Sequence, residues 1–518
     1  MYFIKGGLYI FSSSNTSRTI IIIMIMTILS KISGFIREVT MASYYGAGTA
    51  TDSFFVAHTI PNIFLTIIGV SLSLIFIPIF IEISANNNEK ANMFASDIIS
   101  KSFIIFLSLS LLGYILAPYI VKVMAPGFKE NKFTLTVSLI RILLFTMPFI
   151  SISSIISGLL QSMNRFFVPS LVNIPYNIVI ILGIIFLSHR YGIPVIAWFT
   201  LLASIIQILI QLPFLKNRFH FHYNLLKIGD KDFQQFLILL IPVIIGTAFQ
   251  QVNIIIDRIL ASSLQEGSIS AISYADRLIG LGISVIPMSI AIAIYPKLSK
   301  ASVEKDYVYL RNVLARSILF IVMILAPFTF GTIILRKELV FTVFSRGAFD
   351  SRGLTLTSYA LAFYVLGSIP FSIREIFIRV LFSLKKGKIP MINGLIGAGI
   401  NIILNLIFIK FLGIGGLGLA TSITALISIW MLQRKIKEYI GPIINRESIM
   451  VIGKILVASI LMAFVLIANK DPLPHSTTTI NLIFSLILGT SIYFACISLL
   501  RIDEFSKIIN GLKRVYKN

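Results

Sequence analysis

The amino-acid sequence predicts an all-α protein that crosses a membrane many times, and three observations support this fold class. Only 13% of the 518 residues are charged and 57% are hydrophobic, whereas soluble proteins carry about 25% charged residues. Apolar runs of roughly 20 residues, long enough to span a bilayer as a helix, recur along the whole chain. These runs are continuous and lack the alternation over about 10 residues that is typical of a transmembrane β-strand.

The apolar runs predict about 14 transmembrane helices joined by short connections. No connection is long enough to form a soluble domain. The helices are expected at 18–45, 51–83, 91–121, 134–162, 167–188, 194–215, 232–262, 268–298, 306–335, 353–383, 389–411, 416–437, 449–469 and 478–500.

The sequence contains a weak internal repeat with an offset of about 220 residues. The second predicted helix contains SFFVAHTIPNIF and the eighth contains AISYADRLIGLG, so that Ala57 aligns with Ala275. An offset of six helices keeps the orientation of each helix, which implies two parallel, pseudo-symmetric six-helix lobes with a substrate site between them. We therefore expect an N-terminal lobe at 1–222, a C-terminal lobe at 223–445, and two further helices with a cytoplasmic tail at 446–518.

The net charge of +23 is explained by membrane topology better than by a nucleic-acid partner. With both termini in the cytoplasm, roughly 24 Lys and Arg residues fall in cytoplasmic loops and about 10 fall outside, as the positive-inside rule requires. Anionic lipids are the natural partners of such loops. The single Cys496 excludes a disulfide framework and a cysteine metal site.

The first predicted helix carries charges on one face. At about 100° per residue, Lys31, Gly34, Arg37 and Glu38 fall within an arc of about 120°. A polar face inside a membrane must look onto protein or water, so it marks a candidate site. The alternative is a structural pair between Lys31 and Glu38, with Arg37 reaching toward the outer interface.

The eighth predicted helix carries Asp276 and Arg277 in the sequence YADR. If Arg277 faced the same cavity as Lys31 and Arg37, the three cations would suit a diphosphate, because guanidinium groups match phosphate oxygens. The alternative is an Arg–Asp pair that braces neighbouring helices.

Polar residues in helices 7, 11 and 12 have the composition of a cation site. Asp257 lies deep in a span, Asn401 and Asn405 lie one turn apart on one face, and Thr421 follows in the next helix. With a main-chain carbonyl these groups would offer only oxygen ligands, which suit a hard cation. Ordinary hydrogen bonding between helices is the alternative.

The chain has no G-x-x-x-x-G-K-[ST] loop and no carboxylate-rich extramembrane loop. It is therefore not expected to bind ATP through a P-loop, to be an enzyme or to need a cofactor. An ion gradient or the membrane potential, worth about 2.3 kcal/mol per charge per 100 mV, would supply the energy for transport.

Residues 30–62, SKISGFIREVTMASYYGAGTATDSFFVAHTIPN, closely resemble the first helical hairpin of the MurJ (MviN) family of lipid II flippases. The family pattern there is S-[RK]-x-x-G-F-x-R-[DE], followed by YGAG-x-x-x-D-[AS]-[FY]-F and Pro-Asn. Weaker matches are APGF at 125–128, NRF and a proline at 164–169, YADRL at 274–278 and the Pro-x-Leu-Ser-Lys helix end at 296–300. The resemblance covers essentially the whole chain.

This resemblance implies a monomeric flippase in the bacterial cytoplasmic membrane. Members move undecaprenyl-diphosphate-linked muropeptide to the outer leaflet by alternating access around a cationic cavity, and helices 13 and 14 form a groove for the lipid tail. The matching cavity residues are Lys31, Arg37, Asp52 and Arg277, supported by Gly34, Glu38 and Asp276. The sodium site of some members maps onto Asp257, Asn401, Asn405, Thr421 and the Leu417 carbonyl, with Asn405 at a position that can be acidic.

The sequence departs from the family pattern at two positions, and this departure leaves other lipid-linked substrates as alternatives. Leu65 and Thr66 stand where many members have two arginines after Pro61-Asn62. A flippase for a capsule, teichoic acid or O-antigen lipid carrier therefore remains an alternative. A multidrug or cation antiporter is a weaker one, because a cavity lined by basic residues would repel cationic substrates. A membrane glycosyltransferase or phosphatase is disfavoured because the chain lacks a carboxylate-rich loop.

Overall fold

The computed structural model describes residues 14–216, 219–222, 231–469 and 478–502. Every regular element within these ranges is a helix, which confirms the predicted all-α class. Of these helices, 11 are long and apolar enough to cross a membrane. Three further helices, α2, α10 and α11, have 32, 31 and 36 residues, and a bilayer core needs about 20. The described part of the chain thus agrees with the predicted number of spans.

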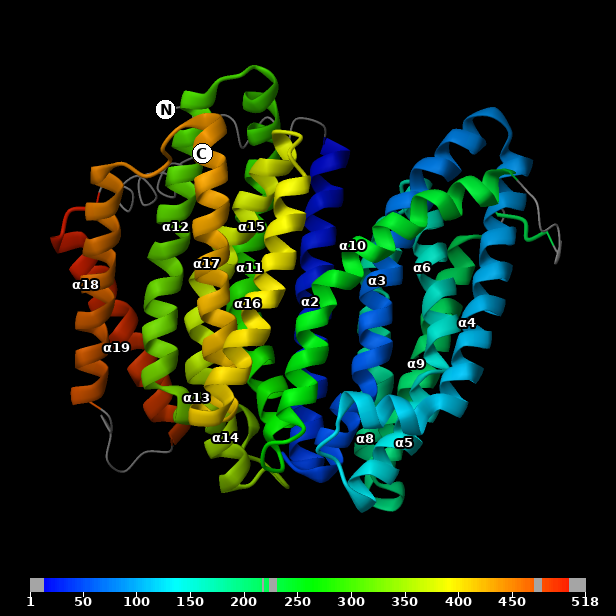
Figure 1. Cartoon of the computed structure of the whole chain (residues 1–518), viewed down its shortest axis with the longest axis horizontal. Coiled ribbons are helices and arrows are strands. Elements are labelled where there is room, and N and C mark those ends of the chain that lie inside the picture. The colour runs from blue at the N-terminus through cyan, green and yellow to red at the C-terminus, as the bar shows by residue number, and fades with distance from the viewer. Residues whose placement is uncertain (1–13, 217–218, 223–230, 470–477, 503–518) are drawn as a thin grey trace. The chain divides into compact units, whose positions relative to one another are not determined.

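Each predicted span corresponds to one helix or to one broken helix (Figure 1). In chain order they are α2 (Ser14–Tyr45), α3 (Thr49–Asn86), α4 (Asn88–Met124), α5 and α6 (Glu130–Leu143, Thr146–Ser162), α7 and α8 (Phe167–Leu171, Asn173–Tyr191), α9 (Pro194–Gln211), α10 (Lys231–Ala261), α11 (Ser268–Val303), α12 (Tyr307–Ile334), α14 and α15 (Ser351–Tyr364, Ser368–Ser383), α16 (Lys388–Leu412), α17 (Ile414–Ile440), α18 (Arg446–Ala468) and α19 (Thr478–Leu499). Helix α13 (Arg336–Phe344) and two short 3₁₀ turns, Leu212–Phe214 and Val365–Gly367, complete the list.

The contacts divide the chain into two compact units. One unit holds the described residues up to Ser270 together with Arg346–Asp350, and the other holds Ala271–Ser345 and the described residues from Ser351 onward. Helix α10 therefore belongs with the N-terminal helices by its contacts. The predicted lobes at 1–222 and 223–445 rest on the internal repeat, and their bounds stay a prediction.

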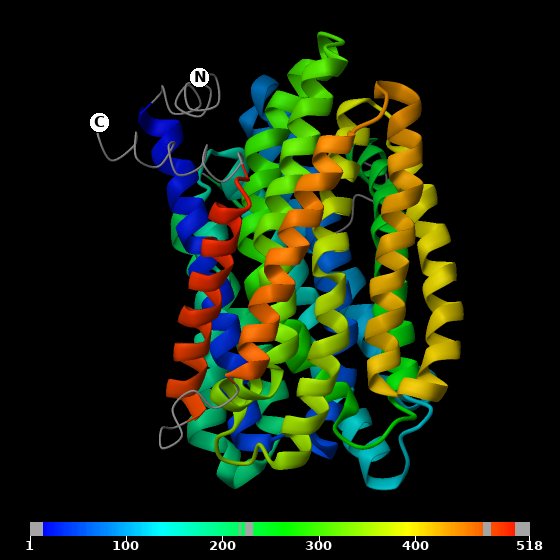
Figure 2. The ribbon, with the colours of Figure 1, turned by 90° about the vertical axis from the view of Figure 1, so that its left-hand side faces the viewer.

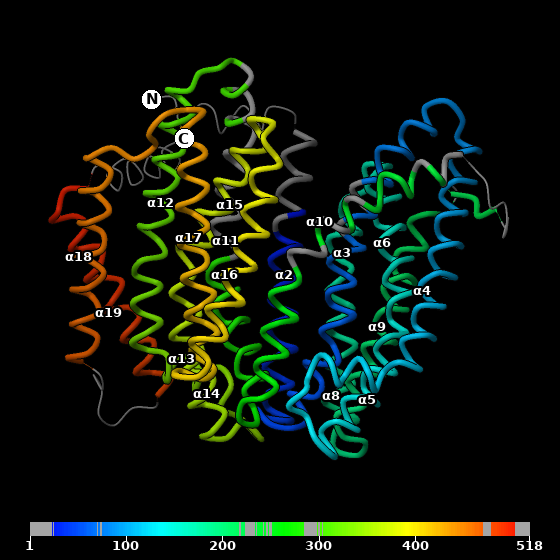
Figure 3. The backbone as a smooth tube through the Cα atoms, in the orientation of Figure 1, coloured from blue at the N-terminus to red at the C-terminus, as the bar shows by residue number. Residues whose placement is uncertain are grey.

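Helix α3 is the centre of the first unit, where it contacts α4, α5, α6 and α10 (Figure 3). Its aromatic side chains form much of the core: Phe76 stacks on Phe80 and on Phe94 of α4, with ring centroids 5.6 and 5.9 Å apart. Gly158 lets α6 approach closely, because an added Cβ there would lie 3.1 Å from Phe76. This packing fixes the helix that carries Asp52 in its first turn.

The second unit has its core among α12, α15, α17, α18 and α19. Helices α18 and α19 stand side by side (Figure 2). The buried hydroxyl of Tyr493 in α19 donates to the main-chain oxygen of Met323 in α12 at 2.5 Å. Large apolar side chains such as Phe411 and Leu499, 80% and 81% exposed, cover the outer faces, as expected for surfaces that meet lipid.

The short segment Arg346–Asp350, which precedes α14, packs against the end of α2 in the first unit. The Ala348 N–H donates to the Ser43 carbonyl at 2.7 Å. Gly46 and Gly347 have φ of +65° and +61°, and an added Cβ would lie 2.4 Å from the Ala348 oxygen and 2.2 Å from the Ser43 oxygen, respectively. Two sequence-distant backbone turns therefore meet where no side chain fits.

Candidate functional site

The charged face of α2 is divided between an exposed cation and a buried ion pair. Lys31 is exposed, whereas the side chains of Arg37 and Glu38 are only 15% and 2% exposed. The Arg37 Nη2 atom donates to Glu38 Oε1 at 2.7 Å. The sequence-based alternative paired Glu38 with Lys31, but in the structure Glu38 accepts from its neighbour Arg37.

Helix α8 supplies a second partner for Arg37. The Arg37 Nη1 atom donates to Asn177 Oδ1 at 3.2 Å, and Asn177 Nδ2 donates to Ser33 Oγ at 2.9 Å. Gly34 packs against this amide, since a Cβ added at Gly34 would lie 3.5 Å from Asn177 Nδ2. Helical periodicity predicts Gly34, Arg37 and Glu38 on one face. Asn177 carries no charge and is 140 residues from Arg37, so the periodicity of α2 gives no sign of it.

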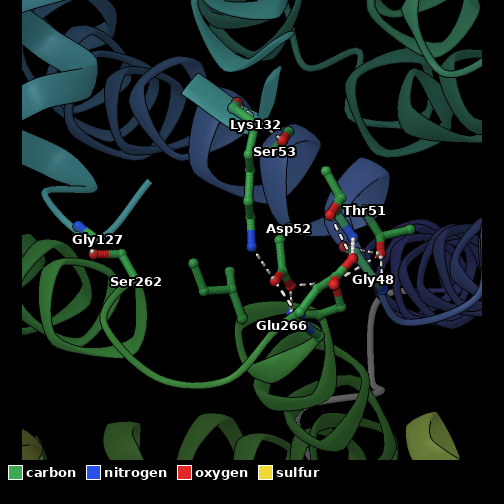
Figure 4. A network of polar contacts seen from close by, with 12 residues as sticks. Gly48, Thr51, Asp52, Ser53, Gly127, Lys132, Ser262 and Glu266 are labelled. Carbon is green, nitrogen blue, oxygen red and sulfur yellow. Dashed lines mark hydrogen bonds and ion pairs between the residues drawn. The ribbon is translucent and has the colours of Figure 1, made fainter. Parts of the chain in front are cut away.

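Asp52 is placed in a dense polar network at the start of α3 (Figure 4). Its Oδ2 accepts from Lys132 Nζ and from the Gly267 N–H, both at 2.8 Å. Its Oδ1 accepts from the Ser270 N–H at 2.8 Å and from the Ser270 hydroxyl at 2.6 Å. The side chain of Asp52 is 1% exposed, so the structure shows a buried carboxylate with both oxygens engaged. Its predicted contact with substrate stays a prediction.

The network around Asp52 joins two helix starts reciprocally. Asp52, in the first turn of α3, accepts from the N–H groups of Gly267 and Ser270, at the start of α11. Glu266, just before α11, accepts from the Thr49 N–H at 2.7 Å and from the Thr49 hydroxyl, at the start of α3. The first N–H groups of a helix lack partners inside it and carry partial positive charge, which explains why each helix start receives a carboxylate.

Lys132 and Glu266 are the partners that sequence reasoning missed. Both are charged residues next to predicted helix starts. Lys132 follows the APGF segment, and Glu266 precedes Gly267. For Glu266 that position is a signal that could have drawn attention to it, because a carboxylate is favoured at the start of a helix. Lys132 gives no such signal, because the helix dipole disfavours a cation in the first turn. Gly127, from the same APGF segment, donates its N–H to Ser262 Oγ at 3.2 Å and adds to the joint (Figure 4).

The eighth-helix residues Asp276 and Arg277 lie exposed on α11 in the second unit. Lys31, Arg37 and Asp52 belong to the first unit. The structure therefore describes each half of the predicted cationic cavity by itself. The convergence of Arg277 with Lys31 and Arg37 on one ligand stays a prediction.

Helices α16 and α17 bring four of the predicted cation ligands together. Asn401 and Asn405 are 1% and 0% exposed. Asn405 Nδ2 donates to Asn401 Oδ1 at 3.1 Å, Asn401 Nδ2 donates to Thr421 Oγ1 at 3.3 Å, and the Thr421 hydroxyl donates to the Leu417 carbonyl at 2.8 Å. Asp257 is half-buried on α10 in the other unit. The four grouped residues offer neutral oxygens, the ligand type that a hard cation accepts.

The segment that departs from the family pattern presents no cation. Leu65 is 42% exposed, and the Thr66 hydroxyl donates to the Asn62 carbonyl one turn earlier at 3.0 Å. An apolar side chain and a hydroxyl engaged with its own helix therefore occupy the two positions.

A bundle of membrane-crossing helices in two units, with an arginine held inside by a carboxylate and an amide, defines a multi-pass membrane transporter. A family model described as "Lipid II flippase MurJ" matches residues 41–487. The chain belongs to this family, and the resemblance seen in residues 30–62 is confirmed.

Curated relatives and solved structures agree with this assignment. The chain is 30% identical to a probable lipid II flippase MurJ of Buchnera aphidicola subsp. Baizongia pistaciae, over 93% of this chain and 95% of the relative. It is 26% identical to a probable lipid II flippase MurJ of Vibrio cholerae, over 93% and 95% of the two chains. A solved lipid II flippase MurJ in an inward closed conformation has a TM-score of 0.80 and 28% identity, covering 93% of this chain and 98% of that one.

A more distant likeness concerns the fold alone. An inward-facing multidrug resistance MATE family transporter of the MOP superfamily has a TM-score of 0.66 at 16% identity, covering 81% of this chain and 98% of that one. The chain thus shares its fold with that transporter.

Proposed function

We propose that this protein translocates lipid II, the undecaprenyl-diphosphate-linked peptidoglycan precursor, from the inner to the outer leaflet of the bacterial cytoplasmic membrane by alternating access. The observation that carries the proposal is the match to the lipid II flippase family over residues 41–487. The protein acts as a transporter and not as an enzyme, works as a monomer, and has both termini in the cytoplasm.

The chemistry of α2 supports an anionic headgroup as substrate. The Arg37 guanidinium has five N–H donors, and its contacts to Glu38 and Asn177 use one on each terminal nitrogen. One N–H on each terminal nitrogen and the Nε–H remain for a substrate. These donors form a fork that matches phosphate oxygens. Lys31 is exposed on the same helix, and it adds a flexible positive charge that can approach the same diphosphate. Arg277 of α11 would supply the third cation for the diphosphate.

An ion gradient or the membrane potential drives the cycle, and Na⁺ is the candidate coupling ion. Asn401, Asn405, Thr421 and the Leu417 carbonyl would hold it, with Asp257 as the one carboxylate. Because Asn405 adds no charge, Na⁺ binding rests on neutral oxygens and on Asp257, which favours weak affinity.

Leu65 and Thr66 support a second candidate substrate. The absence of two cations after Asn62 leaves fewer charges for the diphosphate. A flippase for another polyprenyl-diphosphate-linked glycan would use the same remaining cations and a different headgroup pocket.

Complementation tests the proposal directly. A bacterium depleted of its own lipid II flippase should grow when it expresses this chain, and the variant Arg37→Ala should reach the membrane at the same level without supporting growth. Failure of the wild-type chain to restore growth, together with rescue of a strain that lacks a capsule or O-antigen flippase, would favour the second candidate instead.

A further inference from the structure

Asn177 of α8 forms a bridge to two positions of α2 that lie one helical turn apart. Its Oδ1 accepts from Arg37 Nη1 at 3.2 Å, and its Nδ2 donates to Ser33 Oγ at 2.9 Å. Asn177 is 5% exposed. An amide this deeply buried needs partners for both ends, and α2 provides them.

The orientation of this amide follows from the chain of hydrogen bonds. The Ser33 hydroxyl donates to the Ser30 carbonyl at 2.8 Å, so its lone pairs are left to accept from the amide nitrogen. The amide oxygen must then face Arg37, which has only donors to offer. A flipped amide would set its N–H groups against the guanidinium and its oxygen against a hydroxyl already used as a donor.

Two fixed acceptors determine where the Arg37 guanidinium points. Glu38 holds Nη2 at 2.7 Å, and Asn177 holds Nη1 at 3.2 Å. Glu38 follows Arg37 directly on α2, whereas Asn177 approaches from a different helix. With one acceptor the planar group could still rotate about that contact, and with two acceptors on separate helices its plane is set. The remaining N–H groups then point in a defined direction.

The neutral charge of Asn177 matters as much as its position. Glu38 already compensates Arg37, with a side chain that is 2% exposed. A second carboxylate on the guanidinium would cancel the attraction for an anion, while an amide oxygen orients the group and leaves its charge unchanged.

We propose that Asn177 is a positioning residue that sets the Arg37 guanidinium for the diphosphate of the transported lipid. Asn177 acts through Arg37 and does not itself touch the substrate. This inference rests on the proposed function, because it assigns to Arg37 the diphosphate contact.

The test is direct binding of undecaprenyl diphosphate and of lipid II to the purified full-length protein in lipid nanodiscs. Asn177→Ala should weaken binding about tenfold, since it removes one charge-assisted hydrogen bond. Asn177→Asp has nearly the same shape but should weaken binding further, and it should flatten the salt dependence of binding because it neutralises Arg37. Ser33→Ala, which frees the amide to flip, should have an intermediate effect.

Asn173 provides a matched control on the same helix. It lies one turn before Asn177, and its Oδ1 accepts from Gln207 Nε2 at 3.2 Å, with no charged partner in that bond. Asn173→Ala removes this bond between helices, and Asn173→Asp keeps the acceptor while adding a carboxylate. Both variants should leave the dissociation constant within about twofold of wild type. Thermal unfolding of all variants shows whether the fold is kept.

The possible outcomes distinguish the positioning role of Asn177 from the proposed transport function. If Arg37→Ala abolishes binding while Asn177→Ala and Asn177→Asp bind like wild type, the positioning role is wrong and the proposed function stands. If the Asn177 and Asn173 variants lose binding affinity equally, in proportion to their lower thermal stability, then Asn177 contributes only to helix packing and the inference is overturned. If the wild-type protein binds neither lipid, the proposed function fails and the inference fails with it.

Discussion

Asp52 shows how a single residue can join distant parts of a membrane bundle. Its two oxygens accept from Lys132, Gly267 and Ser270 at 2.6 to 2.8 Å. A buried carboxylate is stable only when such partners replace its hydration. The sequence predicted that Asp52 mattered from its place in the family pattern, but its partners come from other helices and leave no local signature.

The variant Asp52→Asn should lower the free energy of unfolding by about 1–3 kcal/mol, because the amide N–H₂ meets donors and leaves Lys132 without a counter-charge. Thermal unfolding in detergent measures this loss. The control is Asp276→Asn, which changes an exposed carboxylate on α11 and should alter stability by less than about 0.5 kcal/mol. Equal unfolding temperatures for Asp52→Asn and wild type would contradict this account of the network.

Asn405 is the residue at which the cation proposal can be probed. Asn405→Asp adds a negative charge beside Asn401, whose Oδ1 now accepts from the Asn405 amide at 3.1 Å. A carboxylate should strengthen Na⁺ binding and make transport more dependent on Na⁺, while Asp257→Ala should remove any Na⁺ dependence. Transport measured in Na⁺ and in K⁺ buffers checks both variants. The cation proposal is wrong if neither substitution changes the ratio of the two rates.

At the scale of helices, the apolar runs predicted the spans well and their interruptions poorly. The expected helix at 134–162 is α5 and α6, and the one at 353–383 is α14 and α15 with a 3₁₀ turn between them. A break inside an apolar stretch leaves length and hydrophobicity unchanged, so composition does not reveal it. The bridge from Asn177 was missed for a related reason, since contacts between helices depend on packing that a single sequence does not encode locally.

The contact between the end of α2 and the segment Arg346–Asp350 depends on two glycines. Gly347→Ala should destabilise the protein by about 1–3 kcal/mol, because a Cβ would lie 2.2 Å from the Ser43 oxygen and φ is +61°. Gly399→Ala on α16 is the control, since nothing lies within 4 Å of its added Cβ. Thermal unfolding of the two variants should separate them, and equal values would show that the turn can relax.

At the scale of the molecule, the distribution of basic loops predicts that both termini lie in the cytoplasm. That orientation places Lys388 inside and Lys129 outside, and both side chains are exposed. After Cys496, the sole native cysteine, is replaced by Ala, Lys129→Cys should react with an impermeant thiol reagent in intact cells. Lys388→Cys should react only after the membrane is opened. The reverse pattern would invert the topology.

The central claim is that the chain moves lipid II between leaflets with Arg37 engaged on the diphosphate. The most direct measurement is the fraction of lipid II that becomes accessible at the outer leaflet of cells whose own flippase has been depleted. The wild-type chain should restore this fraction, and Arg37→Ala, expressed at the same level, should leave lipid II in the inner leaflet. Lipid II that stays inaccessible with the wild-type chain, or that reaches the outer leaflet equally well with Arg37→Ala, would contradict the account.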